Sequence, residues 1–379
     1  MARHGDSIVV PNVSIEGIQT VVPTRETDPR PTRQVLTWDL VGPEILQRCF
    51  NVVQYYIKEK EDDSGWLVAR WFNFKETLVR ALSEQPMIGG RLRKTERNDG
   101  EMEIVTNDAG VRFIEATIQM NLSEFLDLKQ REEAEAQLVF WKDIDEQNPQ
   151  FSPLFYVQVT IFECGGYSIG ISCSILLVDL FSRTKFLETW ANIHNNIVNY
   201  NNERKLHLPG LKSGTGTRSP LDVIGPSNSN KSSGKTAIFK INSESHNLEI
   251  EWCRRVALAC VEETEMGAAE FCLFVAESFE VIKVESCSKH GMLKADMPDM
   301  QVCYENWDGL GSNDVSFRQG NGPVRVSYWF RSISGGAVVV IPSQEEDQDA
   351  YSVDIIVAIS NEKGVNVIVT VPNEKFREI

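Results

Sequence analysis

The sequence predicts a mixed fold of α-helices and β-strands that is divided into two domains. Segments in which apolar residues alternate, as in strands, are interleaved with segments in which they recur at the spacing of a helix. A stretch rich in Ser, Gly, Asn and Pro, residues 212–235, has the composition of an exposed linker. We therefore predict an N-terminal domain over residues 1–205, a linker over 206–236 and a shorter C-terminal domain over 237–379.

The N-terminal domain begins with strands and one helix. The segment SIEGIQTVVP is typical of a strand that ends at Pro23. The segment WFNFKETLVRALSEQP repeats apolar side chains at Phe74, Leu78 and Leu82, which predicts a helix. The segment GEMEIVTNDAGVRFIEA alternates on both sides of an Asn-Asp turn, which predicts a hairpin.

A second hairpin and a second helix follow. In LFYVQVTIFE, Val157 lies on one face of a strand, and Gln158 and Thr160 lie on the other. Two glycines make the turn, and YSIGISCSI then alternates again. Beyond Asp179 the spacing changes to that of a helix, through residues 186–197. Asp179 is therefore predicted at the junction of a strand and a helix.

The C-terminal domain is predicted to contain further strands around one helix. It opens with the strand TAIFKINSE, and the segment LEIEWCRRVALACVEETE places Trp252, Val256 and Cys260 on one face of a helix. Three more strands are predicted at VRVSYWFRSI, AVVVIP and YSVDIIVAIS. The fold class is therefore α/β, with mixed sheets of the α+β kind.

The composition argues against several classes of function. The net charge is −16 and no dense run of Lys and Arg occurs, so we expect no nucleic-acid partner. The eight cysteines include no C-x-x-C pair, which argues against a zinc site, and their scatter fits a reduced, cytoplasmic protein. No apolar run has the length of a transmembrane segment, and the first residues do not form a secretory signal.

Five segments, taken in order, resemble the plant BAHD acyltransferase family. Each segment alone is a weak signal, but the ordered set is specific. The set covers almost all of the N-terminal half and the final quarter of the chain. The segments are TVVPTRETDPRPTRQVLTWDL, FKETLVRALSEQPMIGGRLR, NDAGVRFIEA, PLFYVQVTIFECGGYSIGI and SVDIIVAISNEKGVNVI.

The resemblance implies a fold, an activity and a location. The fold would be the two-domain fold of chloramphenicol acetyltransferase, with the ligand channel between the domains. The activity would be transfer of an acyl group from acyl-CoA to an alcohol or amine. Acyl-CoA would be a co-substrate, without a bound cofactor or metal. The protein would be a cytoplasmic monomer of plant secondary metabolism, and a peripheral location at the endoplasmic reticulum is the alternative.

The family's signature, His-x-x-x-Asp-Gly, corresponds here to ILLVDL. Ile175 replaces the histidine, which in the family is the general base that takes the proton of the acceptor hydroxyl. Asp179 is retained, and the family implies that it pairs with an arginine; capping of the following helix is the alternative. Leu180 replaces the glycine, and Ser174 is a weak catalytic candidate just before the motif. We therefore assign no certain catalytic residue and expect impaired activity.

Two other parts of the sequence depart from the family. The motif D-F-G-W-G-K-P corresponds to FRQGNGP, residues 317–323, which lacks the Asp and Trp and is interpreted as a plain turn. After TAIFKINSE, a block that in the family forms much of the second domain and part of the coenzyme A channel is absent. We therefore expect a shortened second domain, with exposed apolar faces unless a partner or a rearrangement covers them.

Three functional hypotheses follow. The first is a BAHD-type acyltransferase in which acyl transfer is impaired. The second is a non-catalytic accessory or binding protein of the same fold, with a protein partner. It would resemble the eceriferum-type proteins, which support the elongation of very-long-chain fatty acids in wax biosynthesis. The third is a truncated chain without a stable function of its own.

Overall fold

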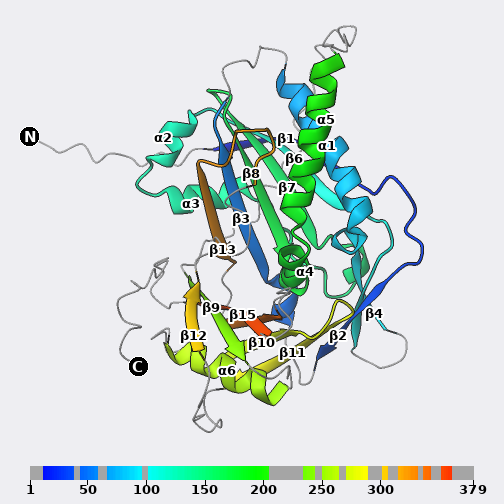
Figure 1. The fold of residues 1–379 in the computed structure, drawn as a ribbon, viewed down its shortest axis with the longest axis vertical. Coiled ribbons are helices and arrows are strands. Elements are labelled where there is room, and N and C mark those ends of the chain that lie inside the picture. Colours follow the sequence, from blue (N-terminus) through cyan, green and yellow to red (C-terminus); the bar gives the residue numbers. More distant parts are fainter. Residues whose placement is uncertain are drawn as a thin grey trace, which may run out of the picture.

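The structure of the protein is a computed structural model in which two β-sheets carry helices on their faces (Figure 1). Both sheets combine parallel and antiparallel pairs, which confirms the predicted class of mixed α and β structure. The described residues are 12–37, 43–58, 66–95, 101–204, 234–243, 250–263, 270–288, 301–305, 315–331, 336–342 and 351–360.

The first sheet has six strands in the order β1-β6-β7-β8-β3-β13. β6 and β7 run parallel, and the other neighbours run antiparallel. The hairpin predicted around the two glycines is the central pair β7 and β8. The strands are β1 (Val13–Val21), β3 (Cys49–Tyr56), β6 (Val111–Ile118), β7 (Phe155–Phe162), β8 (Tyr167–Ser174) and β13 (Arg325–Phe330).

The second sheet has nine strands in the order β12-β9-β15-β14-β10-β11-β2-β5-β4. The pairs β10–β14 and β11–β2 are parallel. The strands are β2 (Thr32–Thr37), β4 (Arg91–Lys94), β5 (Met102–Val105), β9 (Gly234–Ser243), β10 (Glu270–Ala276), β11 (Val281–Ser288), β12 (Gln301–Glu305), β14 (Gly336–Pro342) and β15 (Tyr351–Ser360).

Each sheet takes strands from both halves of the chain. β2, β4 and β5 join the second sheet from the N-terminal half, and β13 joins the first sheet from the C-terminal half. The domain boundaries predicted at residues 205 and 237 stay a prediction. Most of the predicted linker, residues 206–236, lies outside the described residues, because 205–233 are not among them.

The hairpin predicted around Asn107 and Asp108 is wrong. β5 pairs with β2 and β4 in the second sheet, whereas β6 pairs with β1 and β7 in the first. The Asp108 carboxylate instead accepts hydrogen bonds from the amide and the hydroxyl of Thr27, at 3.0 and 2.6 Å. The turn therefore connects the two sheets. Its Asp108 side chain also holds the segment after β1, through the hydrogen bonds with Thr27.

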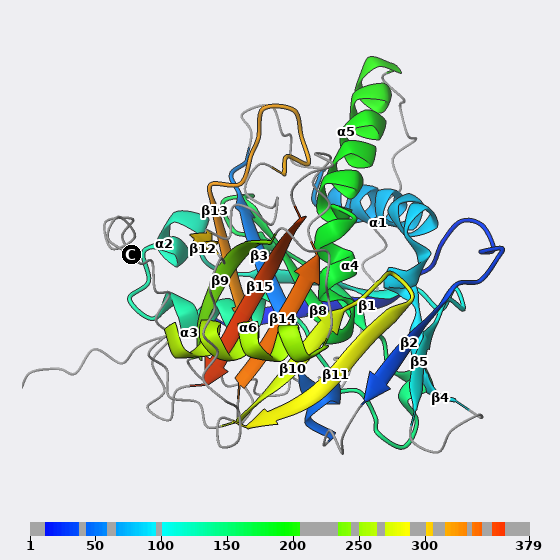
Figure 2. The same cartoon turned by 60° about the horizontal axis from the view of Figure 1, so that its bottom comes forward.

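Helices cover both faces of the first sheet and one face of the second (Figures 1 and 2). α1 and α5 lie side by side on one face of the first sheet, and α2 and α3 lie on the other. α6 covers the second sheet. The helices are α1 (Trp66–Glu84), α2 (Leu122–Leu126), α3 (Arg131–Glu135), α4 (Val178–Arg183), α5 (Phe186–Arg204) and α6 (Ile250–Glu263).

The central strands of the first sheet are buried on both faces. Every residue of β7 and β8 is buried, including the polar residues that alternation places away from the apolar face. The Gln158 side chain donates to the Gln137 carbonyl at 2.8 Å and to the Thr160 hydroxyl at 3.0 Å. The second face is therefore also packed, and Gln158 satisfies its amide group inside that layer.

The apolar faces of β10 and β14, and of the described part of β15, are covered as well. On one face, α6 packs its Cys253, Val256 and Cys260 against β10, β14 and β15. On the other face, Phe274 and Val339 join the core of the first sheet. The exposed faces expected for a shortened domain are therefore not found in the described part of this sheet.

The close approach of the Leu138 carbonyl to the middle of β8 requires a glycine at position 170. A Cβ atom at Gly170 would lie 1.9 Å from the carbonyl oxygen of Leu138. Gly170→Ala should therefore lower the free energy of unfolding by about 1–3 kcal/mol or more, because the overlap forces backbone to move. Urea unfolding followed by tryptophan fluorescence measures this loss.

Gly322→Ala is the matched control for this prediction. The nearest atom to its new Cβ is the Ser316 Oγ at 3.6 Å, so we expect a change within about 0.5 kcal/mol. Equal losses in the two variants would contradict the packing described for β8.

Candidate functional site

The junction segment, residues 174–180, connects β8 to α4. β8 ends at Ser174, one residue before the predicted end, because a 3-10 helix begins at Ile175 and runs to Leu177. α4 follows directly and ends at Arg183. Lys185 then adopts a left-handed φ of 49°, and this turn separates α4 from α5. The aspartate of the motif thus lies where strand and helix were predicted to meet.

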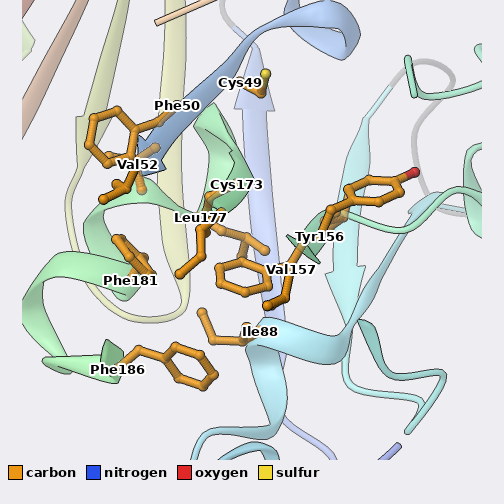
Figure 3. Packing of buried hydrophobic residues seen from close by; sticks show 14 of the residues in the cluster. Cys49, Phe50, Val52, Ile88, Tyr156, Val157, Cys173, Leu177, Phe181 and Phe186 are labelled. Atoms are coloured by element: carbon orange, nitrogen blue, oxygen red, sulfur yellow. The ribbon is translucent and has the colours of Figure 1, made fainter. Parts of the chain in front are cut away.

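Ile175 is fully buried in the apolar core. Its backbone amide donates to the Arg48 carbonyl at 3.2 Å, and its side chain belongs to the cluster that also contains Leu177 and Leu180. Figure 3 shows Cys173, Leu177 and Phe181 of this cluster facing side chains from neighbouring strands. Isoleucine has no lone pair, so position 175 cannot accept a proton from an alcohol.

Asp179 forms a buried ion pair with Arg33. Arg33 Nη2 lies 2.9 Å from Asp179 Oδ2, and both side chains are almost completely removed from solvent. Arg33 belongs to β2 in the second sheet, so the pair joins α4 to that sheet. Asp179 is inside α4, whose first turn has no side-chain cap, so the alternative of a capping role is wrong.

Ser174 caps the 3-10 helix. Its hydroxyl accepts a hydrogen bond from the Leu176 amide at 3.4 Å, and its own amide donates to the Leu154 carbonyl. Within the described residues, no histidine or carboxylate lies in hydrogen-bond range of this hydroxyl. An alcohol without a base is a poor nucleophile at neutral pH. The catalytic role of Ser174 stays a prediction, and its contacts are those of a cap.

Two buried thiols flank the junction segment. Burial raises the pKa of Cys49 to about 12, against the lowering effect of the Arg331 charge. Burial also raises the pKa of Cys173 well above the usual thiol value, and the charge of Asp179 adds to this. Both groups therefore stay protonated at neutral pH and are not thiolate nucleophiles.

His194 is the histidine that lies within the described residues. It is buried on α5, where Nδ1 lies 3.1 Å from the hydroxyl of Thr77 on α1. Its ring stacks on Phe74 at a centroid distance of 4.4 Å. These contacts belong to the packing of α1 against α5. His194 therefore has a structural role in the contact between these two helices.

The segment FRQGNGP contains the turn that the sequence predicts. The Asn321 amide donates to the Arg318 carbonyl at 3.0 Å, and Gly320 has a φ of +80°. The segment also packs on the N-terminal half through Phe317, which is fully buried against Trp190 at a centroid distance of 4.7 Å. Sequence reasoning missed this contact, although a phenylalanine in a polar segment was a signal for it.

Two segments that carry the family resemblance meet at Arg91. Its guanidinium donates to four backbone carbonyls, those of Gly89, Gly90, Ala109 and Gly110, at 2.7–3.1 Å. A Cβ atom at Gly110, where φ is +72°, would lie 2.1 Å from the Val21 carbonyl oxygen. These glycines and this arginine therefore hold the two backbone segments together.

No metal or membrane feature adds to the site in the described part of the chain. Groups of three or more His, Cys, Asp or Glu that could hold a metal ion do not occur there. None of the described helices is long and apolar enough to cross a membrane.

A family model, described as the Transferase family, matches residues 12–209. This match covers slightly more than half of the 379 residues and includes the junction segment.

Several curated proteins are similar to parts of the chain. Protein ECERIFERUM 2 of Arabidopsis thaliana is 29% identical over 183 residues, which are 46% of this chain and 41% of that protein. A hydroxycinnamoyltransferase of Narcissus pseudonarcissus is 29% identical over 179 residues, which are 47% of this chain and 39% of the relative. The aligned regions thus span less than half the length of these relatives.

Solved structures of similar fold include that of vinorine synthase. It is 13% identical, the match covers 93% of this chain and 96% of the other, and the TM-score is 0.42.

The buried ion pair can be tested by stability measurements. Arg33→Met should lower the free energy of unfolding by about 3–5 kcal/mol, because it leaves the Asp179 carboxylate buried without a partner. The double variant Arg33→Met, Asp179→Leu should lose less than Arg33→Met alone, because it removes both charges. Urea unfolding of the three proteins gives the comparison.

Arg80→Met is the control, because Arg80 pairs with Glu76 at the surface of α1, where both side chains are exposed. We expect it to change stability by less than about 1 kcal/mol. A loss in Arg33→Met no larger than in Arg80→Met would contradict the role of the buried pair.

Proposed function

Because the chain belongs to the Transferase family of BAHD acyltransferases, we propose that it is an acyltransferase-type protein in which acyl transfer is impaired or lost. The reaction class is transfer of an acyl group from acyl-CoA to the hydroxyl of an alcohol or to an amine. The observation that carries the proposal is the fully buried Ile175 at the position of the family's general base.

The expected loss in the rate of acyl transfer follows from the role of the general base. A positioned general base contributes about 10²- to 10⁴-fold in rate, and a side chain without a lone pair contributes none of it. The neighbouring polar groups do not replace it: Asp179 is bound to Arg33, and the Ser174 hydroxyl is bound to a backbone amide. Proximity of the reactants would be the remaining source of rate.

The apolar packing around Ile175 also opposes binding of an acceptor there. Leu180 stands where the family motif has glycine, and its side chain is buried in the same cluster. An acceptor hydroxyl would have to enter this cluster without a hydrogen-bond partner, which is costly. The closed packing therefore supports loss of turnover rather than a small reduction.

The second candidate function is a non-catalytic accessory role. It is supported by the similarity to three ECERIFERUM proteins of Arabidopsis thaliana, which are 29–34% identical over the aligned parts. In this role the chain would act beside a protein partner in the elongation of very-long-chain fatty acids. It would lie in the cytoplasm or at the surface of the endoplasmic reticulum. The continuous core of both sheets favours either candidate over a truncated chain without stable structure.

The transfer reaction itself tests the first candidate. The natural chain is incubated with a panel of acyl-CoAs and with plant alcohols and amines, and free coenzyme A and acylated product are measured by mass spectrometry. We expect no product above the rate without protein. An active BAHD enzyme with the motif histidine is the positive control.

Ile175→His and Ile175→Val are run in the same assay, and circular dichroism confirms that each is folded. Both should be inactive. Ile175→Val supplies no base, and the imidazole of Ile175→His would be enclosed by apolar side chains, at a cost in stability of about 1–3 kcal/mol. Product from the natural chain would overturn the proposal. Product from Ile175→His alone would show that substrates reach residue 175.

The accessory role predicts an effect that does not depend on acyl transfer. Coexpression with a fatty-acid condensing enzyme in yeast should lengthen the acyl chains measured by gas chromatography, equally for the natural chain and for Ile175→Val. An unchanged chain-length profile with both proteins would argue against this candidate.

A further inference from the structure

Arg112 and Tyr156 lie next to each other in the first sheet. The parallel register of β6 and β7 pairs them directly, and Thr20 on β1 is the partner of Arg112 on its other side. The Arg112 guanidinium donates to the Thr20 hydroxyl. Residues paired in this way point to the same face of a sheet. Glu115, of opposite parity, binds Lys75 of α1, so Arg112 and Tyr156 point to the face away from α1.

The Tyr156 hydroxyl makes no hydrogen bond within the described part of the chain. Its ring lies between Phe140 and Trp141, at centroid distances of 5.6 and 5.4 Å, and only 3% of its surface is exposed. Figure 3 shows the hydroxyl pointing away from the labelled apolar side chains. Burial raises the pKa of Tyr156 to about 12, against the lowering effect of Arg112 and Arg91, so the group stays an O–H donor.

Arg91 adds a second positive charge beside Arg112. Its four bonds to backbone carbonyls fix it in place, but they leave its charge without a counterion. Burial, and then the charge of Arg112, lower its pKa to about 10, so it remains a cation at neutral pH. Among the described residues, neither Arg91 nor Arg112 forms an ion pair with a carboxylate, whereas Arg33 and Arg93 do.

The carboxylate that acts on Tyr156 belongs to Asp143. It is paired with Arg331 and accepts a hydrogen bond from Trp141 Nε1 at 3.1 Å. The negative charge of Asp143 is therefore already paired with Arg331. Arg112 and Tyr156 are neighbours in the sheet, and the charges of Arg112 and Arg91 both act on the phenol, in a chain whose net charge is −16.

We propose that Arg112 and Tyr156, supported by the positive charge of Arg91, form a binding site for a small oxyanion, namely a carboxylate or phosphate group. The oxyanion would accept hydrogen bonds from the Tyr156 hydroxyl and from the Arg112 guanidinium, in the charge-assisted geometry that arginine favours. Its negative charge would offset the repulsion between the two guanidinium groups. The site lies outside the junction segment and does not depend on acyl transfer.

Isothermal titration calorimetry of the full chain tests the site. Inorganic phosphate and acetate are titrated separately in a buffer without other oxyanions, and sodium chloride keeps the ionic strength constant. We expect saturable binding of at least one of them. Tighter binding of phosphate would identify a phosphate group as the ligand chemistry, and tighter binding of acetate would identify a carboxylate.

Arg112→Gln and Tyr156→Phe should each weaken this binding at least tenfold. Arg93→Gln is the matched control, because Arg93 is a surface residue whose charge is already paired with Glu103, and its affinity should equal that of the natural chain. Thermal melts confirm that the variants are folded. Absence of saturable binding in the natural chain, or equal binding in all four proteins, would overturn the proposal.

Discussion

The buried ion pair between Arg33 and Asp179 is the interaction that determines how the two sheets meet at the junction segment. Two charges removed from water are tolerated only when they are close, because the desolvation cost is large. Their separation of 2.9 Å therefore requires one placement of β2 relative to α4. That placement holds the 3-10 helix from Ile175 to Leu177 between β8 and α4, where its side chains complete the apolar core of both sheets.

The same constraint connects the fold to the proposed loss of acyl transfer. The BAHD family uses this segment to present a base to the acceptor, whereas here the segment presents Ile175 to other apolar side chains. The polar groups that remain have structural partners, since Asp179 binds Arg33 and Ser174 binds a backbone amide. We infer that a protein with this arrangement would keep the stability of the family fold without the proton transfer of its reaction. The similarity to ECERIFERUM proteins is compatible with the proposed accessory role.

Local patterns were sufficient to predict the elements around the junction segment. Alternation predicted β7 and β8, and helical spacing predicted α1 and α5. Comparison with the family motif showed that Ile175 stands at the position of the histidine base. Long-range pairing could not be predicted in this way. Arg33 and Asp179 are 146 positions apart, and no local sequence pattern around either residue indicates which residue it pairs with. The docking of Phe317 and the separation of β5 from β6 into different sheets likewise depend on packing between distant parts of the chain.

Hydrogen exchange at residues 174–180 most directly tests whether the family's catalytic position has become closed core. Mass spectrometry of the full chain, with and without acyl-CoA, measures how often these amides open to solvent. Closed packing predicts exchange only through unfolding of the whole core, at the same slow rate in both conditions. Exchange faster by orders of magnitude than in β7, or protection that appears only with acyl-CoA, would show an accessible ligand channel and contradict this account.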